Sequence, residues 1–60
     1  MLDNYDDIMN PSELAEALYV GRNRAYEILK TTPGLGFRLG NTWKVPKENV
    51  IEYIRNKSRK

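Results

Sequence analysis

A stretch near the middle of the chain, residues 21–30, carries side chains that can hydrogen-bond to nucleic acid. Arginine can read guanine and asparagine can read adenine through paired hydrogen bonds, whereas tyrosine and lysine more often hold phosphates. Ala25, Ile28 and Leu29 share one face of a helix at about 100° per residue, so the other side chains point outward or flank that face. The sequence therefore predicts a helix whose outer side contacts DNA. The predicted contact residues are Arg22, Asn23, Arg24, Tyr26 and Lys30.

Two residues of this stretch allow a second interpretation. Glu27 could accept a hydrogen bond from cytosine N4, but we expect it instead to orient Arg24 or Arg22. Tyr26 either contacts DNA or packs on the hairpin expected at residues 37–45. The alternative for the whole stretch is a solvated helix face without a partner, although such a face would normally contain more Glu and Ala.

Residues 37–45 form two alternating runs around a turn and predict a β-hairpin. The dipeptide Gly40-Asn41 on its own suggests a two-residue loop. A loop one residue longer would bring all four apolar side chains of the hairpin onto one face, and we expect this register because a slip of one residue turns every side chain over. The longer loop, residues 40–42, pairs Leu39 with Trp43 and Phe37 with Val45.

The expected register puts Arg38 and Lys44 opposite each other on the solvent face of the hairpin. Like charges in that position repel unless an anion lies between them, so both are predicted ligands of phosphates or of the minor groove. Asn41 and Thr42 at the tip could hydrogen-bond a backbone phosphate, although turn chemistry alone explains them. Trp43 could stack on single strands, but its place on the apolar face favours packing in the core.

The composition argues against catalysis and metal binding. The chain has no histidine and no cysteine, which removes the commonest general base, the commonest metal ligand and every thiolate. Asp3, Asp6 and Asp7 form an acidic cluster, but the spacing and the closing Glu of a calcium loop are missing. We expect a protein that is not an enzyme and that has no metal, no cofactor and no small-molecule ligand.

Length and charge limit the class of protein further. Sixty residues leave room for one domain. The net charge of +2 conceals a split, because residues 1–18 carry five acidic and no basic side chains and residues 19–60 carry ten basic and three acidic ones. Such asymmetry points to a polyanion partner, with solubility as the alternative. No apolar run approaches the roughly 20 residues that span a bilayer, and the N-terminus is acidic, unlike a signal peptide. We expect a soluble, cytoplasmic protein.

Two short helices are predicted to position the first contact set. Asn10 is a good N-cap for a helix over residues 11–18, and Glu13 can return a bond to the Asn10 N–H. Gly21 can cap a second helix over residues 22–30. Two helices joined by about three residues form a helix-turn-helix.

A third helix is expected over about residues 47–56. We predict a flexible acidic arm at residues 1–9, a domain at residues 10–56 and a basic tail at residues 57–60. The fold class is α+β, mainly α: a small winged helix-turn-helix with a two-stranded hairpin as the wing. The expected core is Leu14, Leu18, Val20, Ala25, Ile28, Leu29, Phe37, Leu39, Trp43, Val45, Val50 and Ile54.

These elements and motifs resemble the excisionase-type, MerR-like winged helix-turn-helix family. The resemblance covers roughly residues 8–55, and its most specific part is the R-N-x-x-Y motif of residues 22–26 followed by F-R-x-G-x-x-W-x-x-P at residues 37–46. Tyr19 and Gly21 stand where the family commonly has glycine and serine. A left-handed conformation at Tyr19 would cost about 1–2 kcal/mol.

The resemblance implies a double-stranded DNA-binding protein, with the second helix in the major groove and the wing on an adjacent minor groove or on the backbone. It further implies an excisionase, a recombination directionality factor of a phage or mobile element that bends attachment-site DNA and assists a tyrosine recombinase (integrase). Because nothing is appended to the domain, we expect this role before that of a small transcriptional regulator of a mobile element, and one protein could do both.

A third interpretation is a protein-interaction module whose arginine and tyrosine face binds an acidic partner. If the partner is DNA, a single module buries only about 600–1,000 Å² of protein surface. We therefore expect several copies on DNA, as a dimer or head to tail.

Overall fold

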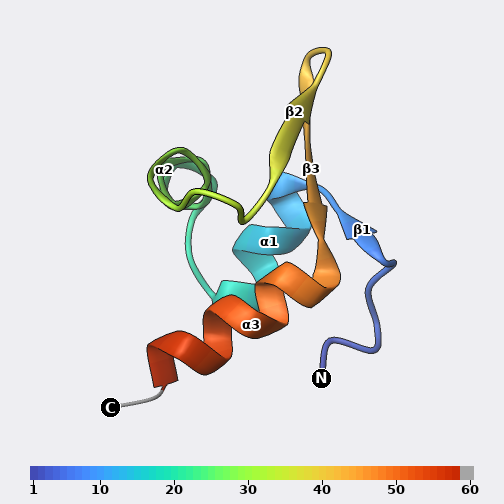
Figure 1. Cartoon of the computed structure of the whole chain (residues 1–60), viewed down its shortest axis with the longest axis vertical. Coiled ribbons are helices and arrows are strands. Elements are labelled where there is room, and N and C mark those ends of the chain that lie inside the picture. The colour runs from blue at the N-terminus through green and yellow to red at the C-terminus, as the bar shows by residue number, and fades with distance from the viewer. Residues whose placement is uncertain (59–60) are drawn as a thin grey trace.

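The computed structural model describes residues 1–58 of the chain. Three helices pack around the base of a small antiparallel sheet, and the hairpin of residues 37–46 projects away from them along the longest dimension of the molecule (Figure 1). This is a winged helix, α+β and mainly α, as the sequence predicted. In chain order the elements are β1 (Ile8–Met9), α1 (Pro11–Leu18), α2 (Arg22–Thr31), β2 (Phe37–Leu39), β3 (Thr42–Pro46) and α3 (Lys47–Ser58).

Helix α1 begins with the capping box that the sequence predicted. The Asn10 side chain accepts from the Glu13 backbone N–H at 2.8 Å, and the Glu13 carboxylate accepts from the Asn10 N–H at 3.0 Å. These two bonds satisfy donors that the first helical turn leaves unpaired.

Helix α1 ends at Leu18 and is capped by Tyr19, which adopts the left-handed conformation (φ 57°, ψ 45°). Tyr19 N–H donates to the Glu16 carbonyl and Val20 N–H to the Ala15 carbonyl, which is the hydrogen-bond pattern of a Schellman motif. That position usually holds glycine because a Cβ atom is strained there. The sharp reversal leads into α2, which starts after Gly21 as predicted and runs one residue further than expected, to Thr31.

The hairpin has the two-residue loop, so the predicted register is wrong. Leu39 pairs with Thr42, Arg38 with Trp43 and Phe37 with Lys44. Gly40 has φ 67° and no positive φ occurs at Asn41, as in a type II′ turn, whose twist matches that of the flanking strands. The local preference of the turn therefore outweighed the apolar alternation.

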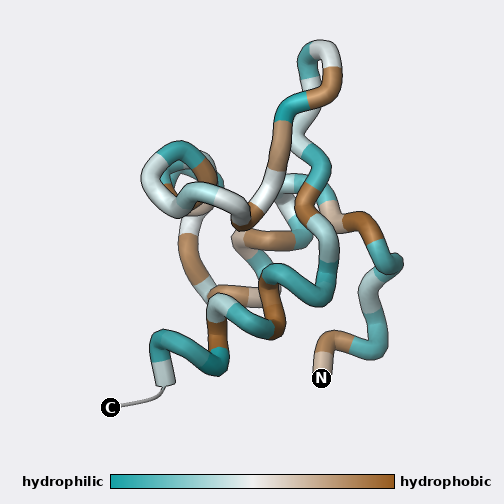
Figure 2. The backbone as a smooth tube through the Cα atoms, in the orientation of Figure 1, coloured by the Kyte–Doolittle hydropathy of each residue, from teal (hydrophilic) through white to brown (hydrophobic). Residues whose placement is uncertain are grey.

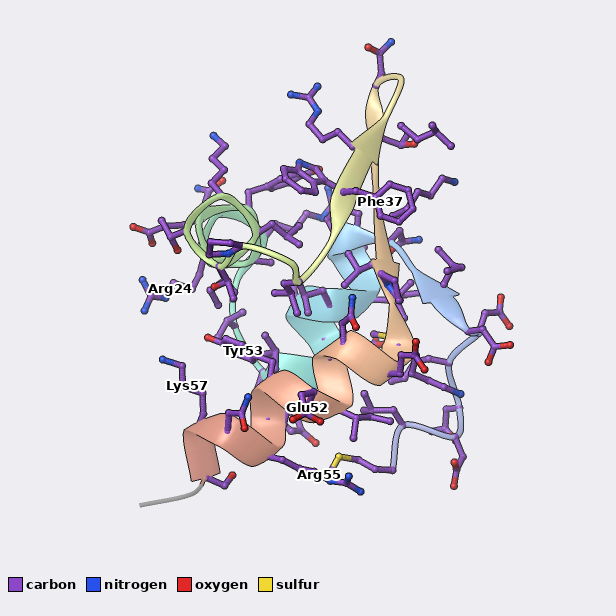
Figure 3. All side chains as sticks on the ribbon, viewed as in Figure 1. Arg24, Phe37, Glu52, Tyr53, Arg55 and Lys57 are labelled. Carbon is purple, nitrogen blue, oxygen red and sulfur yellow. The ribbon has the colours of Figure 1, made fainter. Side chains whose placement is uncertain are left out.

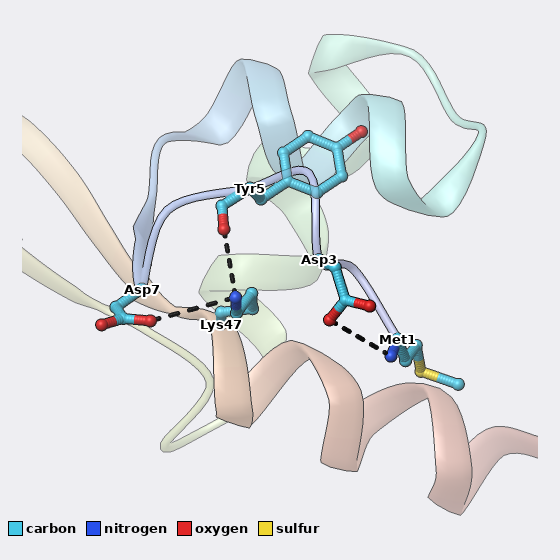
Figure 4. Close-up of polar contacts among 5 residues, drawn as sticks. All are labelled: Met1, Asp3, Tyr5, Asp7 and Lys47. Carbon is cyan, nitrogen blue, oxygen red and sulfur yellow. Dashed lines mark hydrogen bonds and ion pairs between the residues drawn. The ribbon is translucent and has the colours of Figure 1, made fainter.

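The chain before α1 is docked against the domain, although the sequence suggested a loose arm over residues 1–9. Ile8 pairs with Pro46 and Met9 with Val45, so β1 adds a third strand beside β3. The Lys47 ammonium donates to the Tyr5 carbonyl at 3.1 Å and lies 3.9 Å from the Asp7 carboxylate (Figure 4). The ordered domain therefore begins before residue 10.

The core differs from the expected one in which large apolar side chains it contains. Phe37 and Leu39 are exposed, which corrects their predicted place in the core, because the shorter loop turns them to the other face of the hairpin. Met9 and Leu35 occupy the core instead. Figure 2 shows hydrophobic segments of the helices and β3 gathered at the base of the molecule, with further ones out on the hairpin. The buried side chains are Met9, Leu14, Ala15, Ala25, Ile28, Leu29, Leu35, Val45 and Val50.

The link from α2 to β2 is held tightly, and this fixes the wing relative to α2. The Asn49 side chain on α3 donates to the carbonyls of Gly34 and Leu35, both at 3.1 Å. At Gly36, an added Cβ would lie 3.0 Å from the Lys44 carbonyl and 3.1 Å from the Leu29 side chain, so a larger residue would make these neighbours shift by a few tenths of an ångström.

Helix α3 extends through Ser58, two residues beyond its predicted end. Lys57 and Ser58 of the predicted basic tail are thus helical, while Arg59 and Lys60 lie outside the described residues. Within residues 1–58, no helix has both the length and the apolar character that a bilayer crossing requires.

Candidate nucleic-acid interface

The outward side chains of α2 separate into three groups around the helix axis. With Ala25, Ile28 and Leu29 buried, successive steps of about 100° place Asn23, Glu27 and Lys30 on the outermost face. Arg22 and Tyr26 emerge on the flank next to Leu29, and Arg24 emerges on the opposite flank. The structure therefore leaves every predicted contact residue of α2 at the surface but does not gather them on one line. The exposed members of the set are Arg22, Asn23, Arg24, Tyr26 and Lys30.

Arg24 is engaged by a neighbour on its own helix. Its guanidinium donates to the Glu27 carboxylate at 2.7 Å, and both side chains are about three-fifths exposed. Figure 3 shows Arg24 on the side of α2 away from the hairpin, the same side of the molecule as Tyr53 and Lys57. The expectation that Glu27 orients an arginine is confirmed for Arg24. A pair this exposed holds the guanidinium in place but contributes only about 0–1 kcal/mol to stability.

Tyr26 lies on the flank of α2 that faces the wing. It borders a groove of about 350 Å³ together with Trp43, Asn41 and Lys44 of the hairpin, and it is 38% exposed. Of the two roles considered for Tyr26, the structure thus provides for packing beside the wing, with the side chain partly exposed. The far wall of the groove carries acidic side chains, so the groove itself is a poor place for a phosphate. Those acids are Asp6 and Glu13.

The wing residues divide between the two faces of the hairpin. Arg38 pairs with Trp43 and shares its face, which is also the face of the buried Val45. Lys44 pairs with Phe37 and lies on the opposite face with Thr42. The predicted repulsion between Arg38 and Lys44 is therefore wrong, and so is the argument that an anion must separate them. What remains is a hairpin with one cation on each face and Asn41 at its tip.

The start of α2 offers further hydrogen-bond donors. Gly21 provides no side-chain cap, so the N–H groups of the first turn remain available to water or to a phosphate oxygen, which the helix dipole also favours. Arg22 follows directly and is exposed. Within residues 1–58, Arg24 is the one cation of α2 in an ion pair, so Arg22 and Lys30 keep their full charge for an external partner.

The last turns of α3 place Lys57, which the sequence analysis assigned to a basic tail, beside an aromatic ring. The Lys57 ammonium lies 5.6 Å from the centroid of the Tyr53 ring, within the range of a cation–π interaction. The i, i+4 spacing of Tyr53 and Lys57 on a helix was the available signal. Figure 3 places both on the side of the molecule where Arg24 emerges.

Among residues 1–58, no three His, Cys, Asp or Glu side chains come together in a way that could hold a metal ion. The exposed surface of α2 and the wing instead combines guanidinium, ammonium and amide donors, with Glu27 as the acidic side chain of α2. In comparisons with known proteins, no family model matches the chain, and neither a curated protein nor a solved structure shows significant similarity to it.

Proposed function

We propose that this chain binds double-stranded DNA, with α2 in the major groove and the β2–β3 wing against the neighbouring backbone or minor groove. The observation that carries the proposal is the position of uncompensated cations on two adjacent projecting elements. Arg22 and Lys30 on α2 and Arg38 on the near face of the wing are all exposed. A helix of about 10–12 Å diameter fits the major groove, which is about 12 Å wide.

Within this interface the side chains take separate roles. Asn23, on the outermost face of α2, is suited to pair with an adenine edge, and Arg22 to pair with a guanine. Lys30, Arg38 and Lys44 supply phosphate contacts that set the orientation without reading sequence. Tyr26 supports the wing and can offer its hydroxyl to the backbone.

The biological role we propose follows from the resemblance of the sequence motifs: an excisionase of a phage or mobile element, acting in the cytoplasm with a tyrosine recombinase. Several copies would bind adjacent half-sites, because one module of 60 residues covers little DNA. Regulation of a promoter of the same element is the alternative role of the same interface.

Selection from a random duplex library, followed by titration of the selected site at several salt concentrations, tests DNA binding. A recurring motif and a log K that falls linearly with log salt are expected. Arg22→Ala should weaken the selected site by about 1–3 kcal/mol and relax the preference at one base. Arg55→Ala is the matched control, because Figure 3 shows Arg55 on α3 at the end of the molecule opposite the wing.

If no motif is enriched and binding disappears near physiological salt, sequence-specific DNA binding is ruled out. If a site is selected, two further assays separate the two roles. Synapsis or excision by a recombinase that depends on this protein supports the excisionase, and an effect on transcription alone supports the regulator.

A further inference from the structure

Leu39 is a large apolar side chain at the most projecting part of the molecule. It is the last residue of β2, directly before the two-residue turn, and it is 64% exposed. The turn is closed by a hydrogen bond from the Thr42 hydroxyl to the Leu39 carbonyl at 3.2 Å, so the position is fixed. Isolated exposed leucines are common. Leu39, however, shares its face with Phe37, two residues earlier and 49% exposed, which makes an apolar strip along the wing.

The charges beside this strip indicate what kind of surface could cover it. Because the register places Arg38 and Lys44 on opposite faces, the hairpin carries a cation on each side of its tip. A flat acidic protein surface would meet only one of them. A groove between two phosphate chains meets both, and a DNA minor groove has that form.

The dimensions restrict how far the wing can enter. A sheet with side chains on both faces is about 10 Å thick, whereas the minor groove of B-DNA is about 6 Å wide. The body of the hairpin therefore stays outside an undistorted minor groove, and only the tip, residues 39–41, can enter. Leucine is among the side chains that proteins insert between base steps to open this groove and kink the duplex.

We propose that Leu39 is a wedge that inserts at a base step of the minor groove and kinks the DNA. The face that carries Leu39 and Lys44 is then turned toward the floor of the groove beside one phosphate chain, and Arg38 on the other face reaches the opposite chain. This inference rests on the proposed DNA binding and deepens it. It assigns a specificity that involves no hydrogen bond to a base: the site should contain a pyrimidine–purine step, such as TA or CA, under the wing, because these steps unstack most easily.

The test uses the full chain and a duplex selected by it from a random library. End-to-end fluorescence transfer reports the bend, and 2-aminopurine at the adenines beneath the wing reports unstacking. Wild-type protein should bend the duplex by about 20–90° and increase 2-aminopurine emission at one step. Leu39→Ser should bind with less than about a tenfold loss, give little bend and leave 2-aminopurine quenched, whereas Leu39→Met should behave as wild type.

Ile8→Ser is the matched control, because Ile8 lies on the same outer face of the sheet, is 48% exposed and is not on the hairpin. It should keep the full bend, and unfolding curves should show that both serine variants are folded. If Leu39→Ser bends and unstacks the duplex as wild type does, the wedge is overturned while DNA binding stands. If wild-type protein selects no duplex at all, the proposed function fails as well, and the two failures are distinct.

Discussion

Glu27 holds the Arg24 guanidinium at 2.7 Å on the flank of α2 that faces away from the wing. The pair neutralises one of the three cations of α2 and fixes its direction. For the DNA binding that we propose, this pairing has two consequences: fewer charges are available to attract phosphates, and Arg24 is held in one orientation relative to Asn23 and Lys30. A pairing of this kind limits non-specific binding and favours a single geometry.

Glu27→Gln should therefore raise affinity for unrelated duplex while relaxing preference for a selected site. Freeing Arg24 for one more phosphate contact should steepen the slope of log K against log salt by about 0.9. The melting temperature should change little because the pair is exposed. Glu52→Gln, the same change at an exposed position on α3, is the control and should leave the slope unchanged. A loss of affinity for the selected site without any change in slope would instead mean that Glu27 itself reads a base.

The hairpin illustrates which features the sequence could predict and which it could not. Helix positions, caps and the winged architecture could be predicted because they depend on local spacing, such as the capping box of Asn10 and Glu13. The register could not, because two local signals conflicted and the pattern of Phe37 and Leu39 gave no sign that other residues already fill the core. Met9 sits in a strand of two residues, too short to show alternation, and its partner Val45 is far along the chain.

The residues of the candidate interface could likewise be predicted only in part. Periodicity identified the outward residues of α2, since burial of Ala25, Ile28 and Leu29 determines all the other directions. Which flank would meet the wing depends on how the link at Gly36 packs on β3, which is a tertiary contact. Hence the sequence could predict that Arg22 and Arg24 flank the buried face, but not that the flank of Arg24 is the one away from the wing.

Met9→Ala tests whether the segment before α1 is part of the domain. Met9 is 1% exposed and pairs with Val45, so truncation should lower the free energy of unfolding by about 2–5 kcal/mol in urea denaturation. Ile8→Ala removes the neighbouring side chain, which is 48% exposed, and should cost less than about 1 kcal/mol. Met9→Leu should restore most of the stability because it conserves volume. Equal small effects at both positions would mean that the segment is a loose arm after all.

Tyr19→Gly should stabilise the fold. The left-handed conformation at Tyr19 strains its Cβ by about 1–2 kcal/mol, and its side chain is 95% exposed, so little packing is lost. Glycine also has a more flexible unfolded state, so the expected gain is about 1 kcal/mol, or about 4–8 °C in melting temperature. Tyr19→Ala keeps the Cβ atom and should give no comparable gain. An alanine variant as stable as the glycine variant would show that strain at Cβ is not the cause.

Tyr5 ties the N-terminal segment to α1 in a pH-dependent way. Its hydroxyl donates to the Glu16 carboxylate at 2.8 Å, and this hydrogen bond, together with desolvation and the nearby negative charge, raises the Tyr5 pKa above its ordinary value of 10.0. The folded state thus holds the phenolic proton more tightly than the unfolded state. The resulting stability is fully present below the unfolded pKa and is lost as the pH rises through the folded pKa.

Tyr5→Phe should therefore be less stable than wild type at pH 7, and the two unfolding curves should converge once the pH exceeds the folded pKa. Urea denaturation at neutral pH and at several values above about pH 10 measures the difference directly. A Tyr5→Phe difference that stays constant across this range would mean that the hydroxyl contributes without the carboxylate, and that Glu16 is not its partner in solution.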